Sequence, residues 1–228
     1  VIPVIDANCI VAFSTITEGP DTSGMAIRLG LNNTGELEHI EVIIARQADE
    51  GFKFPNPQFY QKAIFDELID EHERANRDQL SAAAHGYFDT LQQNDGTLHV
   101  DFHTECDRVE NGVQTTRTPD EALGKRLHQA TLGCREQFEL GYYRYDDRLR
   151  GRRIVACNSE RGIVVACGFI DHCGKITDYS LSDGTSASSP IRRPHSYYLM
   201  EAFKVERGAI RQVEAIFITV PYHMKSPW

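Results

Sequence analysis

The chain has 228 residues, 41% of them hydrophobic and 25% charged, which is the composition of a globular protein with a buried core. Its net charge of −9 argues against partners such as nucleic acid or an anionic membrane surface, because both require a basic patch. No run of 18 apolar residues occurs, so we expect no membrane-spanning helix.

The termini and cysteines give little information about the cellular compartment. Because the chain begins at Val1 rather than Met, we expect a mature, processed or trimmed form. The glycosylation signal Asn32-Asn33-Thr34 can act only if the protein is exported. The six cysteines form no Cys-x-x-Cys pair, which disfavours a zinc knuckle, and their number does not require a disulfide framework.

The N-terminal part predicts strands at residues 10–18, 25–31 and 35–45. The segment GELEHIEVIIA at 35–45 matches GAIRQVEAIFI at 208–218 with a constant offset of 173. The match predicts two copies of one sheet unit, the first lacking its N-terminal portion. The alternative is a chance likeness, since a glycine followed by alternating apolar residues describes many hairpins.

We therefore divide the chain into a strands-only partial unit at 1–50, a linker and helix at 51–75, and a complete domain at 76–228. The strands-only unit would leave one sheet face bare. We expect that face to be covered by a partner subunit in a homo-oligomer, by a helix at 58–74, or by residues absent from the sequence.

An amphipathic helix is predicted to begin after Asn76, which forms a capping box with Gln79, and to end at Asn94. Its apolar residues recur at helical spacing: Leu80, Ala83, Ala84, Tyr87, Phe88 and Leu91. Further helical stretches are expected at 118–133 and 134–145.

Beyond residue 152 the chain is predicted to be nearly all strand, at 153–158, 162–170, 175–181, 197–206 and 209–220. Helices followed by an antiparallel sheet indicate the α+β class. A curved sheet wrapped on helices forms a cone with a pocket at its open end, walled by the sheet's inner face and by the helix stripe that contains Tyr87 and Phe88.

The final stretch, residues 195–221, has the pattern of an antiparallel hairpin around the turn at Gly208. Polar residues share its apolar rows, and we predict four of them as catalytic candidates: His195, Tyr197, Glu201 and Glu214. A carboxyl group that faces an apolar wall has a raised pKa and can exchange a proton near neutral pH. The alternatives are a β-bulge that turns Glu201 to solvent and a loop-capping role for His195.

Other polar residues give weaker signals. His99, Asp101 and His103 would share one face of a strand, but their spacing is too compact for a usual metal site, and we predict no metal. Asp171 and His172 are predicted to lie in a solvated turn. None of the sequence motifs GxSxG, HExxH, GxGxxG or Walker A is present, and no cofactor is predicted.

Several segments together resemble a known family: CDRVENGVQTT at 106–116, GCREQF at 133–138, Arg152-Arg153, Arg161-Gly162, and residues 203–205 with 208–214. They are similar to tandem nuclear-transport-factor-2-like (NTF2-like, SnoaL-like) domains of an uncharacterised microbial, often fungal, group. The resemblance covers most of 76–228 and, more weakly, 8–46.

The resemblance implies an α+β NTF2-like cone in two copies, the first without its N-terminal helices. It also implies a Cys106–Cys134 disulfide if the protein is exported, and it places Asp107, Glu110 and Asn111 at the pocket mouth. A structural turn at Asn111-Gly112 explains part of that string equally well.

The predicted function is that of a cofactor-independent acid–base enzyme of lyase or isomerase type: a dehydratase, cyclase or retro-aldol enzyme. Glu201 or His195 would remove a proton from a small, largely apolar molecule, and Tyr197 would stabilise the oxyanion. The competing hypotheses are a binding module for a hydrophobic ligand and a dimerisation domain, which fold alone cannot distinguish.

Overall fold

The computed structural model describes residues 1–46, 63–118, 130–189 and 191–228. The N-terminal strands form a four-stranded antiparallel sheet in the order β1-β2-β3-β4. Its strands are β1 (Ile2–Asp6), β2 (Cys9–Glu18), β3 (Asp21–Leu31) and β4 (Leu37–Ala45). Three strands were predicted here, and β1 was not.

The main sheet has six strands in the order β6-β5-β12-β11-β8-β7, antiparallel except for the parallel pair β5 and β12. Its strands are β5 (Asp101–Glu110), β6 (Val113–Gln114), β7 (Arg148–Asn158), β8 (Ile163–His172), β11 (His195–Glu206) and β12 (Ala209–Val220). A small hairpin of β9 (Asp178–Ser180) and β10 (Ser186–Ser188) stands apart from it.

The predicted C-terminal hairpin is confirmed. Strands β11 and β12 pair from Ser196 and Val220 to the turn at Arg207-Gly208, where both residues have positive φ. Positive φ at both central residues suits the two-residue turn of a twisted hairpin.

Helix α1 (Arg77–Gln93) also matches its prediction. The Asn76 side chain accepts from the Gln79 backbone, the Gln79 side chain accepts in return, and Asn94 ends the helix in the left-handed region. The short helix α3 (Cys134–Glu139) occupies only the start of the stretch expected at 134–145. The helix expected at 118–133 lies mostly outside the described residues. No described helix has the length and hydropathy needed to cross a membrane.

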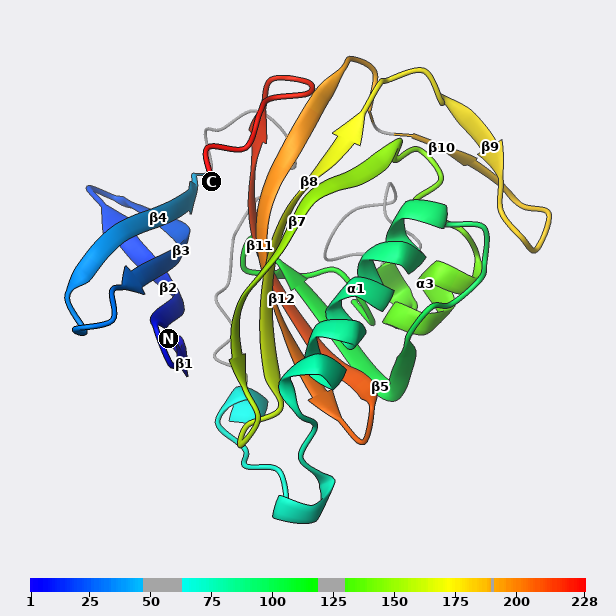
Figure 1. The fold of residues 1–228 in the computed structure, drawn as a ribbon. Coiled ribbons are helices and arrows are strands. Elements are labelled where there is room, and N and C mark those ends of the chain that lie inside the picture. The colour runs from blue at the N-terminus through cyan, green and yellow to red at the C-terminus, as the bar shows by residue number, and fades with distance from the viewer. Residues whose placement is uncertain (47–62, 119–129, 190) are drawn as a thin grey trace.

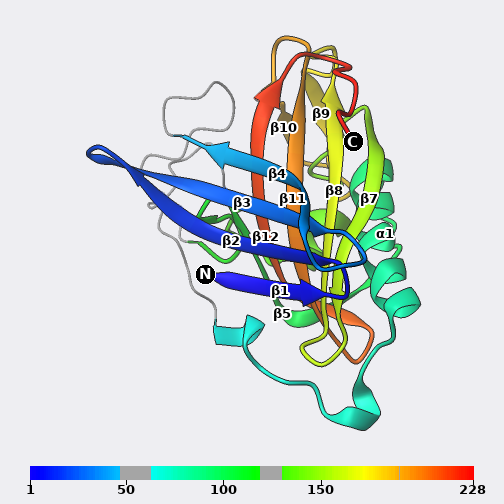
Figure 2. The ribbon, with the colours of Figure 1, turned by 60° about the vertical axis from the view of Figure 1, so that its left-hand side comes forward.

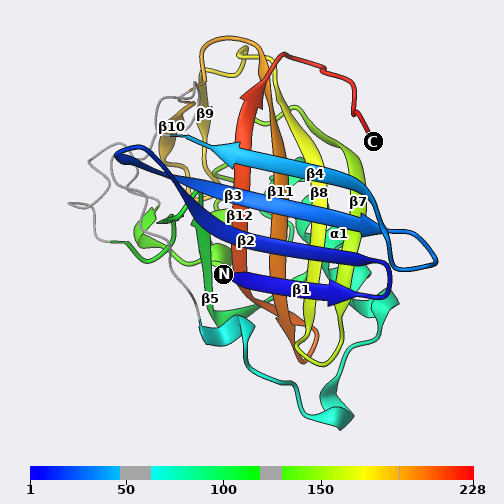
Figure 3. The same cartoon turned by 90° about the vertical axis from the view of Figure 1, so that its left-hand side faces the viewer.

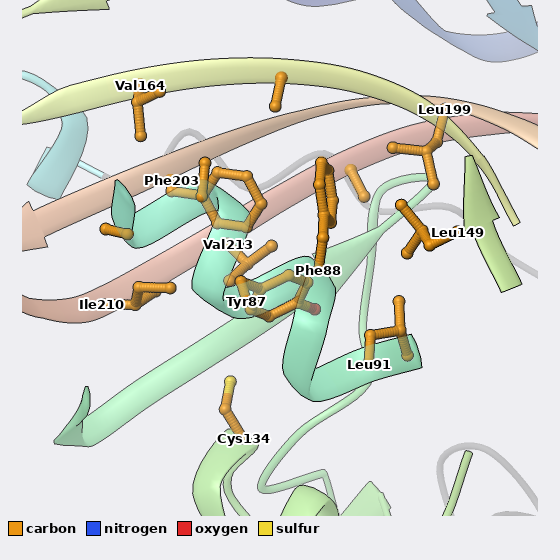
Figure 4. Close-up of a cluster of buried hydrophobic side chains, with 14 of the residues drawn as sticks. Tyr87, Phe88, Leu91, Cys134, Leu149, Val164, Leu199, Phe203, Ile210 and Val213 are labelled. Carbon is orange, nitrogen blue, oxygen red and sulfur yellow. The ribbon is translucent and has the colours of Figure 1, made fainter. Parts of the chain in front are cut away.

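The inner face of the main sheet packs on α1 and α3 (Figure 1). In Figure 4, Tyr87, Phe88 and Leu91 extend from α1 toward Phe203 and Leu199 of β11. The row of apolar residues predicted at helical spacing is therefore the surface through which α1 packs on the main sheet. This contact closes one end of the shell that the curved sheet and the helices form.

The outer face of the main sheet is covered by the N-terminal sheet, whose strands run across those of the main sheet (Figures 2 and 3). Residues of both sheets form a second core, with Val11 and Phe13 on one side and Val165 and Met200 on the other. On the face that points away from the main sheet, Ile5, Ile40 and Val42 are exposed, and no described helix or strand covers them.

A buried ion pair joins the two sheets. The Arg153 guanidinium lies 2.7 Å from Glu41 Oε1, and the hydroxyl of Tyr198 donates to the same oxygen. Because Glu41 is almost completely buried, the pair is screened little by solvent and fixes β4 against the main sheet.

Two further expectations need correction. In the described part of 58–74, Ala63–Phe65 and Glu71–Glu73 are short 3-10 helices, and Phe65 packs into the core between the sheets rather than over the open face. The disulfide expected between Cys106 and Cys134 is absent: both are free, buried thiols. Burial raises the pKa of Cys106 well above its ordinary value, which keeps the thiol protonated and unreactive.

Candidate functional site

A narrow cavity lies between the inner face of the main sheet and the helices. The space between its walls is about 870 Å³ with the open mouth included. Most of the wall is apolar, from Leu91, Ile170, Leu199 and Phe217. An apolar cleft with a few polar groups is the usual form of a small-molecule site.

Glu201 is the polar residue that β11 presents to this cavity. It pairs with Ala166 and Ala215 in the neighbouring strands, and its side chain shares a face with Leu199 and Phe203. It is 4% exposed, and Oε2 has no hydrogen-bond partner among the described residues. Burial, and then the nearby charge of Glu110, raise its pKa from 4.5 to about 8, against the opposing effect of Arg108.

A buried polar cluster lies beside Glu201, centred on Arg108 of β5. The Arg108 guanidinium donates to Glu110 at 3.1 Å, to Thr115 at 3.2 Å and to Gln137 at 2.5 Å, and it also donates to the hydroxyl of Tyr143. These contacts compensate the charge of a side chain that is almost fully buried. The cluster places the opposite charges of Arg108 and Glu110 beside a carboxyl group that can take up or release a proton.

A second polar pair lines another part of the cavity, from His172 at the end of β8 and Asp146 in the loop before β7. Nδ1 of His172 lies 2.9 Å from Oδ1 of Asp146, and both side chains are almost completely buried. Nε2 of His172 has no partner in the described part of the chain. The ring of Tyr197 stands edge-on to that of His172, with centroids 4.8 Å apart.

Residues 73–217 match the family described as "Domain of unknown function (DUF8021)". The chain belongs to this family. The matched range begins just before α1 and ends within β12, so it holds both polar centres of the cavity. A search of curated proteins finds no match.

Solved structures with a similar fold include AclR, a putative hydroxylase from Streptomyces galilaeus, with 9% identity, a TM-score of 0.39, and coverage of 64% of this chain and 83% of that one. AusH from Aspergillus nidulans has 12% identity, a TM-score of 0.38, and coverage of 62% and 85%. A SnoaL-like polyketide cyclase from Agrobacterium tumefaciens has 17% identity, a TM-score of 0.34, and coverage of 60% and 90%.

The four catalytic candidates from the hairpin do not all reach the cavity. Glu201 and Tyr197 line it, whereas His195 lies next to it, half-exposed, with its ring 5.0 Å from that of His172. Glu214 faces the other way, toward the N-terminal sheet, because its strand partner Ala202 belongs to the core between the sheets.

A β-bulge explains the different orientation of Glu214. The register of β12 shifts between Ile210 and Gln212, so Arg211 is an extra residue. Ile210 therefore faces the cavity side, while Glu214 and Ile216 face outward. The prediction that Glu214 shares the hairpin's cavity-facing apolar row was therefore wrong.

The five substrate-binding candidates are also divided. Tyr87 and Glu110 line the cavity, whereas Phe88 is buried in the core away from it. Asp107 points off the cavity side of β5 and pairs with Arg117 at 2.9 Å. Asn111 is structural: it adopts positive φ, and its amide bonds the backbone of Phe217 in both directions.

Sequence reasoning missed Arg108, Gln137, Tyr143, Asp146 and His172. For two of these residues, the alternation of a strand in the sequence could have indicated that they face the cavity. His172 continues the alternation Val164, Ala166, Ile170 that faces the cavity, so extending the predicted strand by two residues would have placed it there. Arg108 lies between Asp107 and Val109 in β5, on the face that the strand turns inward. Gln137 lies on the short helix α3, and Tyr143 and Asp146 lie in the loop after it, where no regular alternation points toward the cavity.

The compact His99, Asp101 and His103 group lies away from the cavity. Residue 99 precedes β5, while Asp101 and His103 are on the strand, where Asp101 is exposed. Among the residues that the structure describes, no three His, Cys, Asp or Glu side chains are grouped as metal ligands.

Proposed function

We propose that the protein is an acid–base enzyme of lyase or isomerase type, independent of cofactors, acting on a small and largely apolar molecule in this cavity. The observation that carries the proposal is Glu201, a buried carboxyl group that lines an apolar cavity with one oxygen unpartnered in the described chain. A structural carboxyl group would have both oxygens satisfied, because an unsatisfied buried polar atom costs stability. A substrate that bonds Oε2 would remove that cost.

The raised pKa makes Glu201 suitable for proton transfer. With a pKa of about 8 it is mostly protonated at neutral pH, and a minor fraction is ionised and basic. Ionised Glu201 would remove a proton next to a substrate carbonyl, and the protonated form would return it. Tyr87 also lines the cavity, and burial raises the pKa of its phenol well above the ordinary value, so it stays a hydrogen-bond donor toward a developing oxyanion.

An exchange experiment tests this role without knowledge of the natural substrate. We expect the wild-type protein to catalyse deuterium uptake at the acidic carbon of 2-tetralone, an apolar bicyclic ketone, in D₂O followed by NMR. The Glu201→Gln variant should be slower by about 10²–10⁴-fold. The wild-type rate should rise with pH up to about 8, as the base form of Glu201 accumulates. Equal rates for the two proteins would overturn the proposed role.

The alternative function is a binding module that holds a hydrophobic ligand without converting it. The narrow apolar cavity serves that role equally well. Saturable binding of 2-tetralone with no exchange above the solvent rate would favour this alternative.

We also propose that the N-terminal sheet is a partial second copy of the main sheet. Each of β1-β2-β3-β4 and β7-β8-β11-β12 is an antiparallel meander, and the offset of 173 aligns β4 with β12, the last strand of each. Aligned Glu41 and Glu214 are both buried, and each faces the opposite sheet. The bare face of the N-terminal sheet then corresponds to the face that the main sheet covers with α1.

The open face of that sheet is where we propose that a second copy of the chain docks. Ile5, Ile10, Leu29 and Ile40 form one apolar row across its four strands. We expect a homo-oligomer in sedimentation analysis and a monomer for the variant Ile40→Lys with Val42→Lys. A variant that sediments as the wild type does would exclude this face as the interface.

A further inference from the structure

The cavity has two polar ends. Glu201 lies at one end with the Arg108 cluster, and His172 lies at the other with Asp146 and Tyr197. Tyr197 and Glu201 are four residues apart on β11, a separation of about 13 Å between their Cα atoms at the usual strand rise. The wall between the two ends is apolar, formed by Leu199, Ile170 and Phe217 among others.

The His172 end presents a buried hydrogen-bonding atom on a residue that lines the cavity. Nδ1 lies 2.9 Å from Oδ1 of Asp146, an ion-pair distance without hydrogen-bond geometry, and the charge of the carboxylate favours a ring orientation with Nδ1 toward it. Nε2 is then left buried in a residue that lines the cavity, and none of the described residues bonds it. The side chain is only 2% exposed, so water has little access to it. Neighbouring aromatic rings of Tyr145 and Tyr197 pack against the imidazole and hold it in place.

We propose that His172 forms a second hydrogen-bonding end of the pocket, and that the substrate is an elongated, largely apolar compound with an oxygen function at each end. One oxygen would bond Nε2 of His172 and the other would bond Glu201. The substrate class rests on the proposed function, because Glu201 defines the first end. Asp146 acts as a positioning residue in this arrangement, since it contacts the imidazole and orients Nε2.

The dimensions of the cavity restrict the apolar body of this compound. A molecule must be long enough to reach from one polar end to the other, comparable to the ~13 Å between the Cα atoms of Tyr197 and Glu201, which corresponds to two or three linked or fused rings. A compound with one oxygen function would leave either Nε2 or Oε2 unsatisfied.

Binding of three matched probes tests the proposal by calorimetry: biphenyl, 4-hydroxybiphenyl and 4,4′-dihydroxybiphenyl. The wild-type protein should bind the dihydroxy compound about tenfold more tightly than the monohydroxy compound, the value of one added hydrogen bond. The variant His172→Phe keeps a ring without the nitrogen and should lose this difference. His172→Gln keeps a polar group near the Nε2 position and should restore part of it, while His85→Phe on the exposed face of α1 should behave as the wild type.

A measurement on the unaltered protein covers the case in which a His172 variant fails to fold. The ¹⁵N resonance of His172 Nε2 should shift when 4,4′-dihydroxybiphenyl binds and should move little with biphenyl. No binding of the dihydroxy compound to the wild type, equal affinities for the two phenols, or an unchanged Nε2 resonance would each overturn the proposal.

Separate experiments test the enzymatic role proposed for Glu201 and the second polar end proposed at His172. If Glu201→Gln leaves deuterium exchange unchanged while the two-ended probe still requires His172, the enzymatic proposal fails and the ligand class stands. If exchange depends on Glu201 but the three probes show no dependence on His172, only the second polar end is excluded.

Discussion

The free energy of unfolding of the wild-type protein is expected to fall between pH 4.5 and pH 8, and the variant Glu201→Gln should lose most of this pH dependence. The folded-state pKa of about 8 lies above the ordinary 4.5, so the folded protein binds a proton at this site that the unfolded chain releases. The stabilisation is complete below pH 4.5 and disappears as the pH rises through 8. At 1.36 kcal/mol for each unit of pKa, the total is on the order of 4–5 kcal/mol.

The pH window separates this effect from those of other groups. Lys204 is buried, and its pKa is lowered from 10.5 to about 8 by desolvation, so its contribution changes only above that pH. Carboxylates with lowered pKa values, such as Asp171, lose their stabilisation only below pH 4. Asp146, whose pKa burial also raises, contributes in the same direction, so the share of Glu201 in this interval is the difference between the wild-type and Glu201→Gln curves.

Urea unfolding at several pH values measures this dependence. The variant Glu105→Gln, at an exposed position of β5, should follow the wild-type curve. A Glu201→Gln curve as steep as the wild-type one would mean that Glu201 is ionised in the folded protein at neutral pH, which would contradict its assignment as the proton-transfer group.

The second large effect is expected at Arg108. Replacing it by Met should lower the free energy of unfolding by about 3–5 kcal/mol, because Glu110 and the polar groups of Gln137 and Tyr143 lose their shared cationic partner. Arg135→Met is the matched control: Arg135 is half-exposed and pairs with Glu139 within α3, so its loss should cost less than about 1 kcal/mol.

A double variant separates charge from packing at this site. Adding Glu110→Gln to Arg108→Met should recover part of the lost stability, because the carboxylate left without its cation is then neutral. A loss below about 1 kcal/mol for Arg108→Met alone would show that the cluster contributes no net stability, as some buried ion pairs do not.

Local sequence patterns determined the helices and hairpins that are stabilised by contacts between residues close together in the chain. The capping box at Asn76, the helical stripe through Tyr87 and Phe88, and the hairpin around Gly208 all depend on interactions between residues near one another in the chain. Such periodicity also identified Glu201 as a polar residue in an apolar row, and that row faces the cavity. The α+β class with few helices and a large sheet follows from the same signals.

Tertiary structure decided what no local pattern contains. A one-residue bulge at Arg211 changed the face of Glu214, because a shift of one residue reverses every side chain in a strand. The Arg108 cluster and the His172–Asp146 pair join residues that are 29 and 26 positions apart along the chain, from different strands and loops. Only the packing of those segments on one sheet brings the charges together, and burial in that packing raises the pKa of Glu201.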